Sequence, residues 1–163
     1  MTEFDIPLVC DWRNRPHVRR FYQKAPLSLD EAYAKLLPRV RGEDPTLAHI
    51  ATLRGCAFGY VQSYLILGTP SYAEQIGVSD GIGMDYFIGE PELVGRGVGK
   101  AMLSAYLAEV LFPAFPQERR CIVCYETANA ASGGVLTSLG FRREKELIED
   151  GVPSTMMILD RPS

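Results

Sequence analysis

The sequence predicts a single α/β domain in which helices flank a mixed sheet. Its 163 residues are 47% hydrophobic and 23% charged, an ordinary globular composition, and a chain of this length favours one hydrophobic core. Strand-like and helix-like segments alternate in the second half of the chain, which indicates parallel strands joined by helices. No internal repeat or low-complexity linker interrupts the sequence. We therefore expect one domain over residues 1–163.

Two helices are expected ahead of the first strand. Asp5 can cap a short helix that carries Pro7 in its first turn, and Pro16 interrupts the basic segment that follows. Ser28 and Glu31 form a capping box before apolar residues at helical spacing. The box predicts the start of the second helix.

A hairpin and a long loop are expected next. Residues 48–53 and 57–67 have strand character and are joined by a turn at 54–55, which predicts an antiparallel pair. Residues 68–83 are rich in turn-forming residues, and loops of this length are commonly functional. We expect this loop to lie on the substrate side.

The centre of the chain predicts a strand-helix-strand unit. Residues 84–89 form the first strand, and an apolar stripe from Val98 onward predicts a helix that ends at Pro113 and Pro116. Residues 121–125 form a buried strand. It should run parallel to the first strand, because such units make right-handed crossovers.

The last quarter predicts one more helix and a closing hairpin. Asn129 can cap a helix that Gly140 terminates. Residues 141–147 and 155–159 are expected to pair as antiparallel strands around a turn at 150–151.

The segment from Leu93 to Lys100, LVGRGVGK, predicts an anion-binding turn. Its glycines at 95, 97 and 99 let the backbone turn tightly with amides pointing outward, and the following helix adds its positive dipole end. The spacing excludes a Walker loop, because the Gly-Lys pair follows one residue too early, and it excludes a G-x-G-x-x-G fingerprint. The turn is therefore suited to another phosphate compound.

Metal and redox chemistry are disfavoured. Cys121 and Cys124 have C-x-x-C spacing, but within a strand positions three apart point to opposite faces. The two histidines, His17 and His49, form no metal-binding pattern. We expect no metal.

Charge and hydropathy limit the partners. The net charge of −3 argues against nucleic-acid binding, which needs a basic face, and suits a cationic small-molecule substrate. No apolar run reaches the roughly 18 residues of a membrane span, and the N-terminus lacks signal-peptide features. We expect a cytoplasmic protein that binds no membrane and is a monomer or a homodimer.

Seven motifs spread over most of the chain form a recognisable set. The more specific ones are Gly-Tyr-Val-Gln-Ser-Tyr at 59–64 and Gly-Met-Asp at 83–85. The others are residues 12–18, the glycine turn, Leu111-Phe112, Asn129 and residues 139–141. On this set the chain resembles the GNAT superfamily, and within it the aminoglycoside 6′-N-acetyltransferases. The resemblance implies a central mixed, mostly antiparallel sheet with a parallel, splayed strand pair and flanking helices.

The resemblance also implies a reaction. Acetyl-CoA would be the co-substrate, and the 6′-amine of an aminoglycoside antibiotic would attack its thioester directly, which confers resistance. At pH 7 such an amine is mostly ammonium, so a nearby carboxylate serves both to bind it and to remove its proton. Asp85 matches the acid that the family uses as general base and is the catalytic candidate.

The implied coenzyme site combines the glycine turn, the splayed strand and a helix cap. Val94 would contact the diphosphate through its backbone only, and amides around residues 86–88 would stabilise the oxyanion. The cofactor-binding candidates are Tyr86, Phe87, Ile88, Val94, Gly95, Arg96, Gly97, Val98, Gly99, Lys100 and Asn129.

The implied substrate site needs several carboxylates, because an aminoglycoside carries several ammonium groups. Two tyrosines could add flat walls and hydroxyl groups. The substrate-binding candidates are Tyr64, Tyr72, Glu74, Asp80, Glu126 and Asp150.

The chain departs from the family pattern in three places. Leu136 stands where many members carry a tyrosine general acid, so water or Tyr125 would protonate the thiolate. Cys124 stands at the position of an acidic residue, for which Glu126 could compensate. Residues 1–5 do not supply the strand that usually precedes the first helix, so either that strand is missing or the sequence starts late.

Two other functions remain open on the sequence. One is a GNAT acyltransferase that acts on a different amine, such as a siderophore hydroxylysine, a polyamine or a protein N-terminus. The other is a non-catalytic CoA-binding module, which Leu136 and the missing first strand favour.

Overall fold

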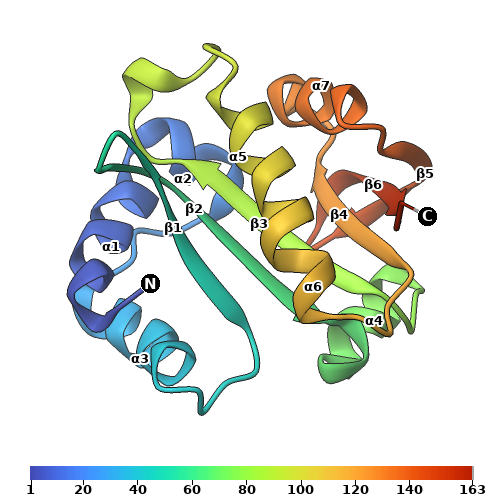
Figure 1. Cartoon of the computed structure of the whole chain (residues 1–163), viewed down its shortest axis with the longest axis horizontal. Helices are drawn as coiled ribbons and strands as arrows, with labels where there is room; N and C mark the ends of the chain where they lie inside the picture. The colour runs from blue at the N-terminus through green and yellow to red at the C-terminus, as the bar shows by residue number, and fades with distance from the viewer. Residues whose placement is uncertain (163) are drawn as a thin grey trace. The chain divides into compact units, whose positions relative to one another are not determined.

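A computed structural model describes residues 1–162 of the chain, with six strands in one sheet (Figure 1). The strand order is β1-β2-β3-β4-β6-β5. The strands are β1 (Leu47–Leu53), β2 (Cys56–Leu65), β3 (Ile82–Ile88), β4 (Arg120–Glu126), β5 (Arg142–Glu149) and β6 (Val152–Asp160). The helices are α1 (Ile6–Asn14), α2 (Pro16–Tyr22), α3 (Leu29–Val40), α4 (Pro70–Ile76), α5 (Val98–Tyr106), α6 (Phe112–Ala114) and α7 (Ala130–Ser138).

The pairing of the strands confirms a mixed sheet with one parallel pair. β3 and β4 run parallel, with Ile82 opposite Cys121 and Gly83 opposite Ile122, and their ladder ends there within the described residues. β4 pairs with β6 antiparallel along its whole length, and β5 and β6 form a hairpin. The parallel strands therefore part after two rungs, as the predicted splay requires.

Most predicted elements are confirmed, but three helices precede β1 where two were expected, because Pro16 begins α2 instead of interrupting the segment. The Ser28 hydroxyl accepts from the Glu31 amide while the Glu31 carboxylate accepts from the Ser28 amide. Arg54 and Gly55 adopt positive φ angles in the β1–β2 turn. Asp5 differs from the prediction, because its carboxylate accepts from the Thr2 amide and hydroxyl and caps a short 3₁₀ turn instead of α1.

The prediction of a long loop over residues 68–83 is wrong. The chain forms a 3₁₀ turn at Ile66–Gly68 and then α4, and β3 already begins at Ile82. The helix ends at Gly77, whose φ is +63°. Ile76 is buried in an apolar cluster with Ile122 of β4. This tertiary packing stabilises a helix too short to form alone.

The helical segment after the glycine turn ends at Ala114, between the two prolines predicted to stop it. A π-helical turn at Leu107–Leu111 links α5 to α6, and Pro113 lies within α6. The proline is tolerated there because it occupies the first turn of that helix. No helix among the described residues is long and apolar enough to cross a membrane.

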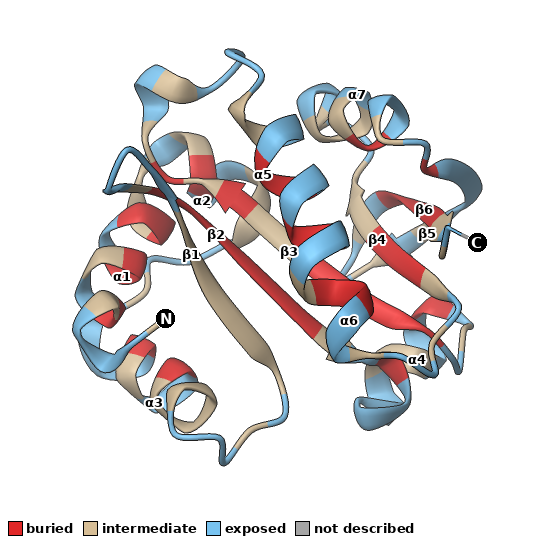
Figure 2. Cartoon of the chain, viewed as in Figure 1, coloured by how far each residue is buried: buried red, intermediate tan, exposed pale blue. Residues whose placement is uncertain are grey.

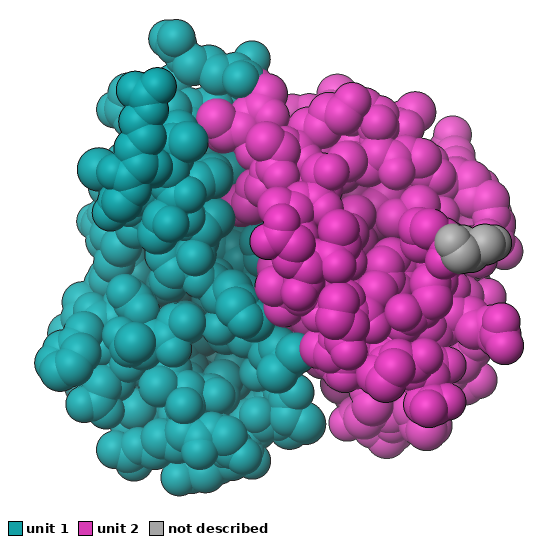
Figure 3. All heavy atoms as spheres, viewed as in Figure 1, with its two compact units in different colours: residues 1–62, 86–96 teal, residues 63–85, 97–163 magenta. Residues whose placement is uncertain are grey.

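Two compact units are distinguished along the chain (Figure 3). Unit 1 comprises Met1–Gln62 and Tyr86–Arg96, and unit 2 comprises Ser63–Asp85 and Gly97–Ser163. Strands β2 and β3 each contribute residues to both units, and both are largely buried (Figure 2). The expectation of one domain over residues 1–163 stays a prediction.

A polar network in unit 1 fixes the chain just after β3. The Trp12 indole donates to the Glu90 carboxylate at 2.8 Å. The Arg15 guanidinium donates to that carboxylate at 2.7 Å and to the Gly89 carbonyl at 2.9 Å. His17 Nε2 lies 3.0 Å from the Ile88 carbonyl. The hydrogen bond from Arg15, followed by that from Trp12, lowers the pKa of Glu90 and favours its ionised form.

We expect Gly89→Ala to destabilise the fold by about 2 kcal/mol or more. An added Cβ would lie 2.2 Å from the Trp12 ring, which is fully buried and has no room to move. Gly68→Ala is the matched control, because nothing lies within 4 Å of its Cβ position. Urea unfolding of both variants measures the difference, and equal stabilities would contradict this account of the packing.

Candidate active site

One face of the sheet in unit 2 carries Asp85. Side chains alternate along a strand, so Asp85 shares the face of Gly83, and Cys124 shares the face of Ile122. Because Gly83 and Ile122 are paired, Asp85 and Cys124 lie on the same face at the point where β3 and β4 part. Tyr64 marks this face, since a Cβ on Gly83 would approach its ring to 2.4 Å.

Helix α4 places a second tyrosine over this face. The rings of Tyr64 and Tyr72 meet edge to face with centroids 6.1 Å apart. Tyr72 and Cys124 both pack against the apolar cluster beneath. The cluster consists of Ile66, Ile76, Ile122, Met156 and Ile158.

The neighbouring strands add two carboxylates to the same face. Cys124 is opposite Met156, and Glu126 is opposite Ser154. On the other side of β6, Glu149 is opposite Val152. Val152, Ser154 and Met156 alternate along one strand and share a face, so Glu126 and Glu149 lie on the face of Asp85.

Glu149 is a candidate that the sequence analysis missed. It follows Leu147 by two residues, and Leu147 packs into the cluster under Tyr72. That period of two was the available signal. The sequence points instead to its neighbour Asp150, in the turn, as the substrate-binding candidate.

The Tyr72 hydroxyl connects the members of this face. It lies close enough to Tyr64, Cys124 and Glu149 to lower the pKa of each, against the larger effect of burial. One hydroxyl proton can be donated to only one of these acceptors at a time. A ligand that competes for one acceptor would therefore free the donor for another.

Burial keeps the uncharged members of the face neutral. It raises the pKa of the Cys124 thiol to about 12 and raises the pKa of both tyrosines well above their usual value. Burial, and then the negative charge of Asp85, also raise the pKa of Glu149. Lys145, on the same face of β5, lowers the pKa of Cys124. The face thus combines carboxylates with neutral hydrogen-bonding groups and suits a cationic ligand.

Three predicted substrate residues lie elsewhere. Asp80 is exposed before β3 and forms an ion pair with Arg120. The Asp150 carboxylate is exposed at the hairpin turn and accepts from Gln75 at 3.1 Å. Glu74 is exposed, because it projects from α4 on the side away from Tyr72. The structure brings together Tyr64, Tyr72, Asp85 and Glu126 of the candidates, without these three.

The glycine turn contains two residues in the left-handed region next to the N-terminus of α5. Gly95 and Gly97 have φ angles of +75° and +80°, and a Cβ at either position would meet open space. In the first backbone hydrogen bond of α5, the Ala101 amide donates to the Gly97 carbonyl. The amides of Val98, Gly99 and Lys100 consequently have no helical acceptor and are available at the helix N-terminus.

The other coenzyme candidates differ in their exposure and in the hydrogen-bonding groups available to a ligand. Phe87 is 7% exposed and packs between the rings of Trp12 and Tyr60, so only its backbone could contact a ligand. Val94 is 47% exposed. The Asn129 side chain caps α7 by accepting from the Ser132 amide at 3.2 Å, and its NH₂ group remains a donor.

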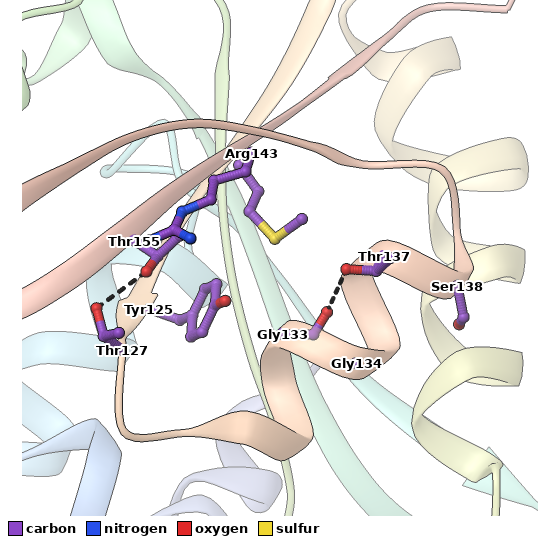
Figure 4. Close-up of a pocket in the computed structure, with 9 residues that line it drawn as sticks. Tyr125, Thr127, Gly133, Gly134, Thr137, Ser138, Arg143 and Thr155 are labelled. Carbon is purple, nitrogen blue, oxygen red and sulfur yellow. Dashed lines mark hydrogen bonds between the residues drawn. The ribbon is translucent and has the colours of Figure 1, made fainter.

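An open pocket of about 520 Å³ lies on the opposite face of the sheet (Figure 4). It is formed by α7, the end of β4, and strands β5 and β6. Three of its threonine hydroxyls are engaged internally: Thr127 and Thr155 lie 2.9 Å apart, and Thr137 donates to the Gly133 carbonyl at 2.8 Å. Arg143 pairs with Glu146. Tyr125 also lines the pocket.

Two adjacent glycines of α7 should respond differently to alanine. Gly134→Ala should stabilise the fold by about 0.5–1 kcal/mol through helix propensity alone, because its Cβ position is open. At Gly133 the new Cβ would lie 2.5 Å from the Tyr125 hydroxyl, which offsets that gain. Thermal unfolding measures both. Tyr125→Phe should recover part of the stability of Gly133→Ala, because it removes the 2.5 Å contact while Cζ stays 3.0 Å away, and no recovery at all would contradict the hydroxyl contact as the cause.

Glu149→Gln should raise the melting temperature at pH 7, by on the order of 1–3 °C. A raised folded-state pKa means that the charged form is less favourable in the folded protein. The contribution of Glu149 to stability is therefore fully present below its unfolded pKa of about 4.3 and is lost as pH rises through the folded value. Melting curves from pH 4 to 7.5 test this, and a variant less stable than wild type at pH 7 would contradict it.

Among the described residues, no group of three or more His, Cys, Asp or Glu side chains could hold a metal ion. All four cysteines are free thiols.

Known proteins share both the sequence and this architecture. The chain is 29% identical over 151 residues to the aminoglycoside N(6′)-acetyltransferases type 1 of Klebsiella pneumoniae and Serratia marcescens, covering 85% of this chain and 75% of each relative. Crystal structures of aminoglycoside acetyltransferase AAC(6′)-Ib, one with coenzyme A and one with coenzyme A and kanamycin, superpose with a TM-score of 0.85 at 27% identity. These superpositions cover 99% of this chain and 92% of the other. The model of the acetyltransferase (GNAT) domain matches residues 2–148, so the chain belongs to the GNAT acetyltransferase family.

Proposed function

We propose that this chain transfers the acetyl group of acetyl-CoA to the 6′-amine of an aminoglycoside and so confers resistance to that antibiotic. The observation that carries the proposal is the sheet face that bears Asp85 at the parting of β3 and β4, with Glu126 on β4 and Glu149 on β5 on the same face. Support comes from the relatives named as aminoglycoside N(6′)-acetyltransferases and from the similar structure that contains coenzyme A and kanamycin.

The amides at the start of α5 hold the diphosphate of the co-substrate in this proposal. Val98, Gly99 and Lys100 present amides without helical acceptors, and the open glycines at 95 and 97 let the phosphates approach the backbone. The parted strands leave main-chain groups of β3 and β4 that an amide-containing arm can pair with. Acetyl-CoA supplies the thioester when bound. Asn129 donates from the cap of α7.

Asp85 binds the acceptor ammonium and accepts its proton. The freed amine then forms a C–N bond to the thioester carbonyl, and backbone amides around residues 86–88 stabilise the oxyanion. The C–S bond breaks and the sulfur leaves as thiolate, while the new amide nitrogen loses its second proton to solvent or to the departing thiolate. A thiol pKa of about 8.5 makes this feasible without a dedicated acid. Leu136 cannot serve as an acid, and Tyr125 faces the other side of the sheet, toward α7.

The remaining parts of the proposal concern setting and assembly. The free thiols suit a reducing cytoplasm, which is where we place the activity. It requires neither a membrane nor a nucleic acid, and a monomer or a homodimer can perform it.

Adding kanamycin and acetyl-CoA to the protein should release coenzyme A thiol, which a thiol reagent detects. Asp85→Asn should lower kcat by about 10²-fold or more, because an unassisted ammonium is a poor nucleophile. Asp80→Asn is the matched control and should retain wild-type rates, because that exposed carboxylate only pairs with Arg120.

The outcome also separates the alternatives. Turnover of a polyamine, hydroxylysine or an N-terminal peptide in place of kanamycin would identify an acyltransferase for another amine. A rise in melting temperature with acetyl-CoA but no turnover of any amine would identify a CoA-binding module. Expression in a sensitive bacterium tests resistance.

A further inference from the structure

The peptide group that joins Ile88 to Gly89, at the end of β3, is bound at both of its polar ends. Its amide donates to the Phe58 carbonyl of β2 at 2.8 Å, and His17 Nε2 lies 3.0 Å from its carbonyl oxygen. A carbonyl oxygen only accepts, so Nε2 of His17 carries the hydrogen. This peptide group therefore cannot rotate without losing two hydrogen bonds.

The next peptide group, from Gly89 to Glu90, is held in the same way. Arg15 donates to its carbonyl at 2.9 Å, and its amide donates to the Phe58 carbonyl at 3.4 Å. The Glu90 carboxylate in turn accepts from Arg15 and from Trp12. Side chains from α1 and from the start of α2 thus fix the chain directly after Ile88.

The Ile88 amide points to the edge of β3 at which the strand ladder ends early. The Ile88–Gly89 peptide group is trans, so its carbonyl points away from its amide and hence away from β2. Within a strand, the N–H and C=O of one residue point to the same side. The Ile88 amide therefore shares the edge of its carbonyl, and on that edge the ladder of β3 ends at Gly83 among the described residues.

We propose that His17 is a positioning residue that orients the Ile88 amide as an oxyanion donor, with Arg15 fixing the peptide group that follows. The inference rests on the proposed acetyl transfer, in which amides around residues 86–88 take that role. A donor that is already oriented stabilises the developing charge without reorganisation, so its loss lowers kcat more than it changes KM.

The kinetic test compares His17→Met with His17→Gln. Both new side chains are unbranched and similar in length, but only glutamine has an NH₂ donor. With kanamycin as acceptor, His17→Met should lower kcat about tenfold or more while the KM values for acetyl-CoA and kanamycin stay near wild type. His17→Gln should recover most of the rate. Asp11→Asn is the control and should match wild type, because this exposed carboxylate pairs with Arg15 on the helix surface.

Amide hydrogen exchange gives a readout that does not depend on turnover. The Gly89 amide belongs to the peptide group whose carbonyl His17 binds, so it should exchange about tenfold or more faster in His17→Met than in wild type. His17→Gln should restore its protection. The amides of α5 should exchange at wild-type rates in both variants, as expected when the end of β3 alone is loosened.

The outcomes separate this inference from the proposed function. Equal kcat values for the two variants, or a fall in kcat with Gly89 exchange unchanged, would overturn positioning by His17. Faster exchange throughout both units would show a general loss of structure and would overturn it as well. If wild type acetylates no amine, the proposed transfer fails, and the exchange comparison still decides whether His17 fixes this peptide group.

Discussion

The parting of β3 from β4 is the constraint on which the candidate site depends. The two strands share only the rungs Ile82–Cys121 and Gly83–Ile122. A main-chain group that loses its ladder partner must find another acceptor or donor, and in an open sheet that partner is water or ligand. The parting begins two residues before Asp85, so the catalytic candidate lies beside main-chain groups that can bind an acyl donor.

Glycine 83 illustrates how packing and chemistry are coupled at that point. The Tyr64 ring lies so close above it that any side chain would collide. Tyr64 in turn contacts Tyr72, whose hydroxyl reaches Cys124 and Glu149. Burial and the charge of Asp85 both disfavour the ionised form of Glu149 on this face. A cationic ligand would offset the repulsion between the two carboxylates. The charges that favour binding of such a ligand therefore destabilise the unliganded fold.

Local signals predicted the sheet and most helices because they act within a few residues. The Ser28–Glu31 box and the positive φ angles at Arg54 and Gly55 need no tertiary information. Helix α4 could not be predicted in this way. Its sequence is rich in turn-forming residues, and the helix is stabilised by the tertiary packing of Ile76. The placement of the carboxylates was hard to predict for a related reason. A carboxylate near a turn can point either way, and Asp150 points outward while Glu149 points inward.

Cys124 shows why spacing alone could not locate the acids of the site. The resemblance placed an acidic residue at that position, and the thiol there is neutral with a pKa near 12. Glu126 was the expected substitute because it is close in sequence. Tyr72, however, lies near both Cys124 and Glu149, although 24 residues lie between these two in the sequence. The register of β4, β6 and β5 brings them to one hydroxyl. Cys124 thus shares its face of the sheet with a carboxylate two strands away, on β5, and only the pairing register reveals it.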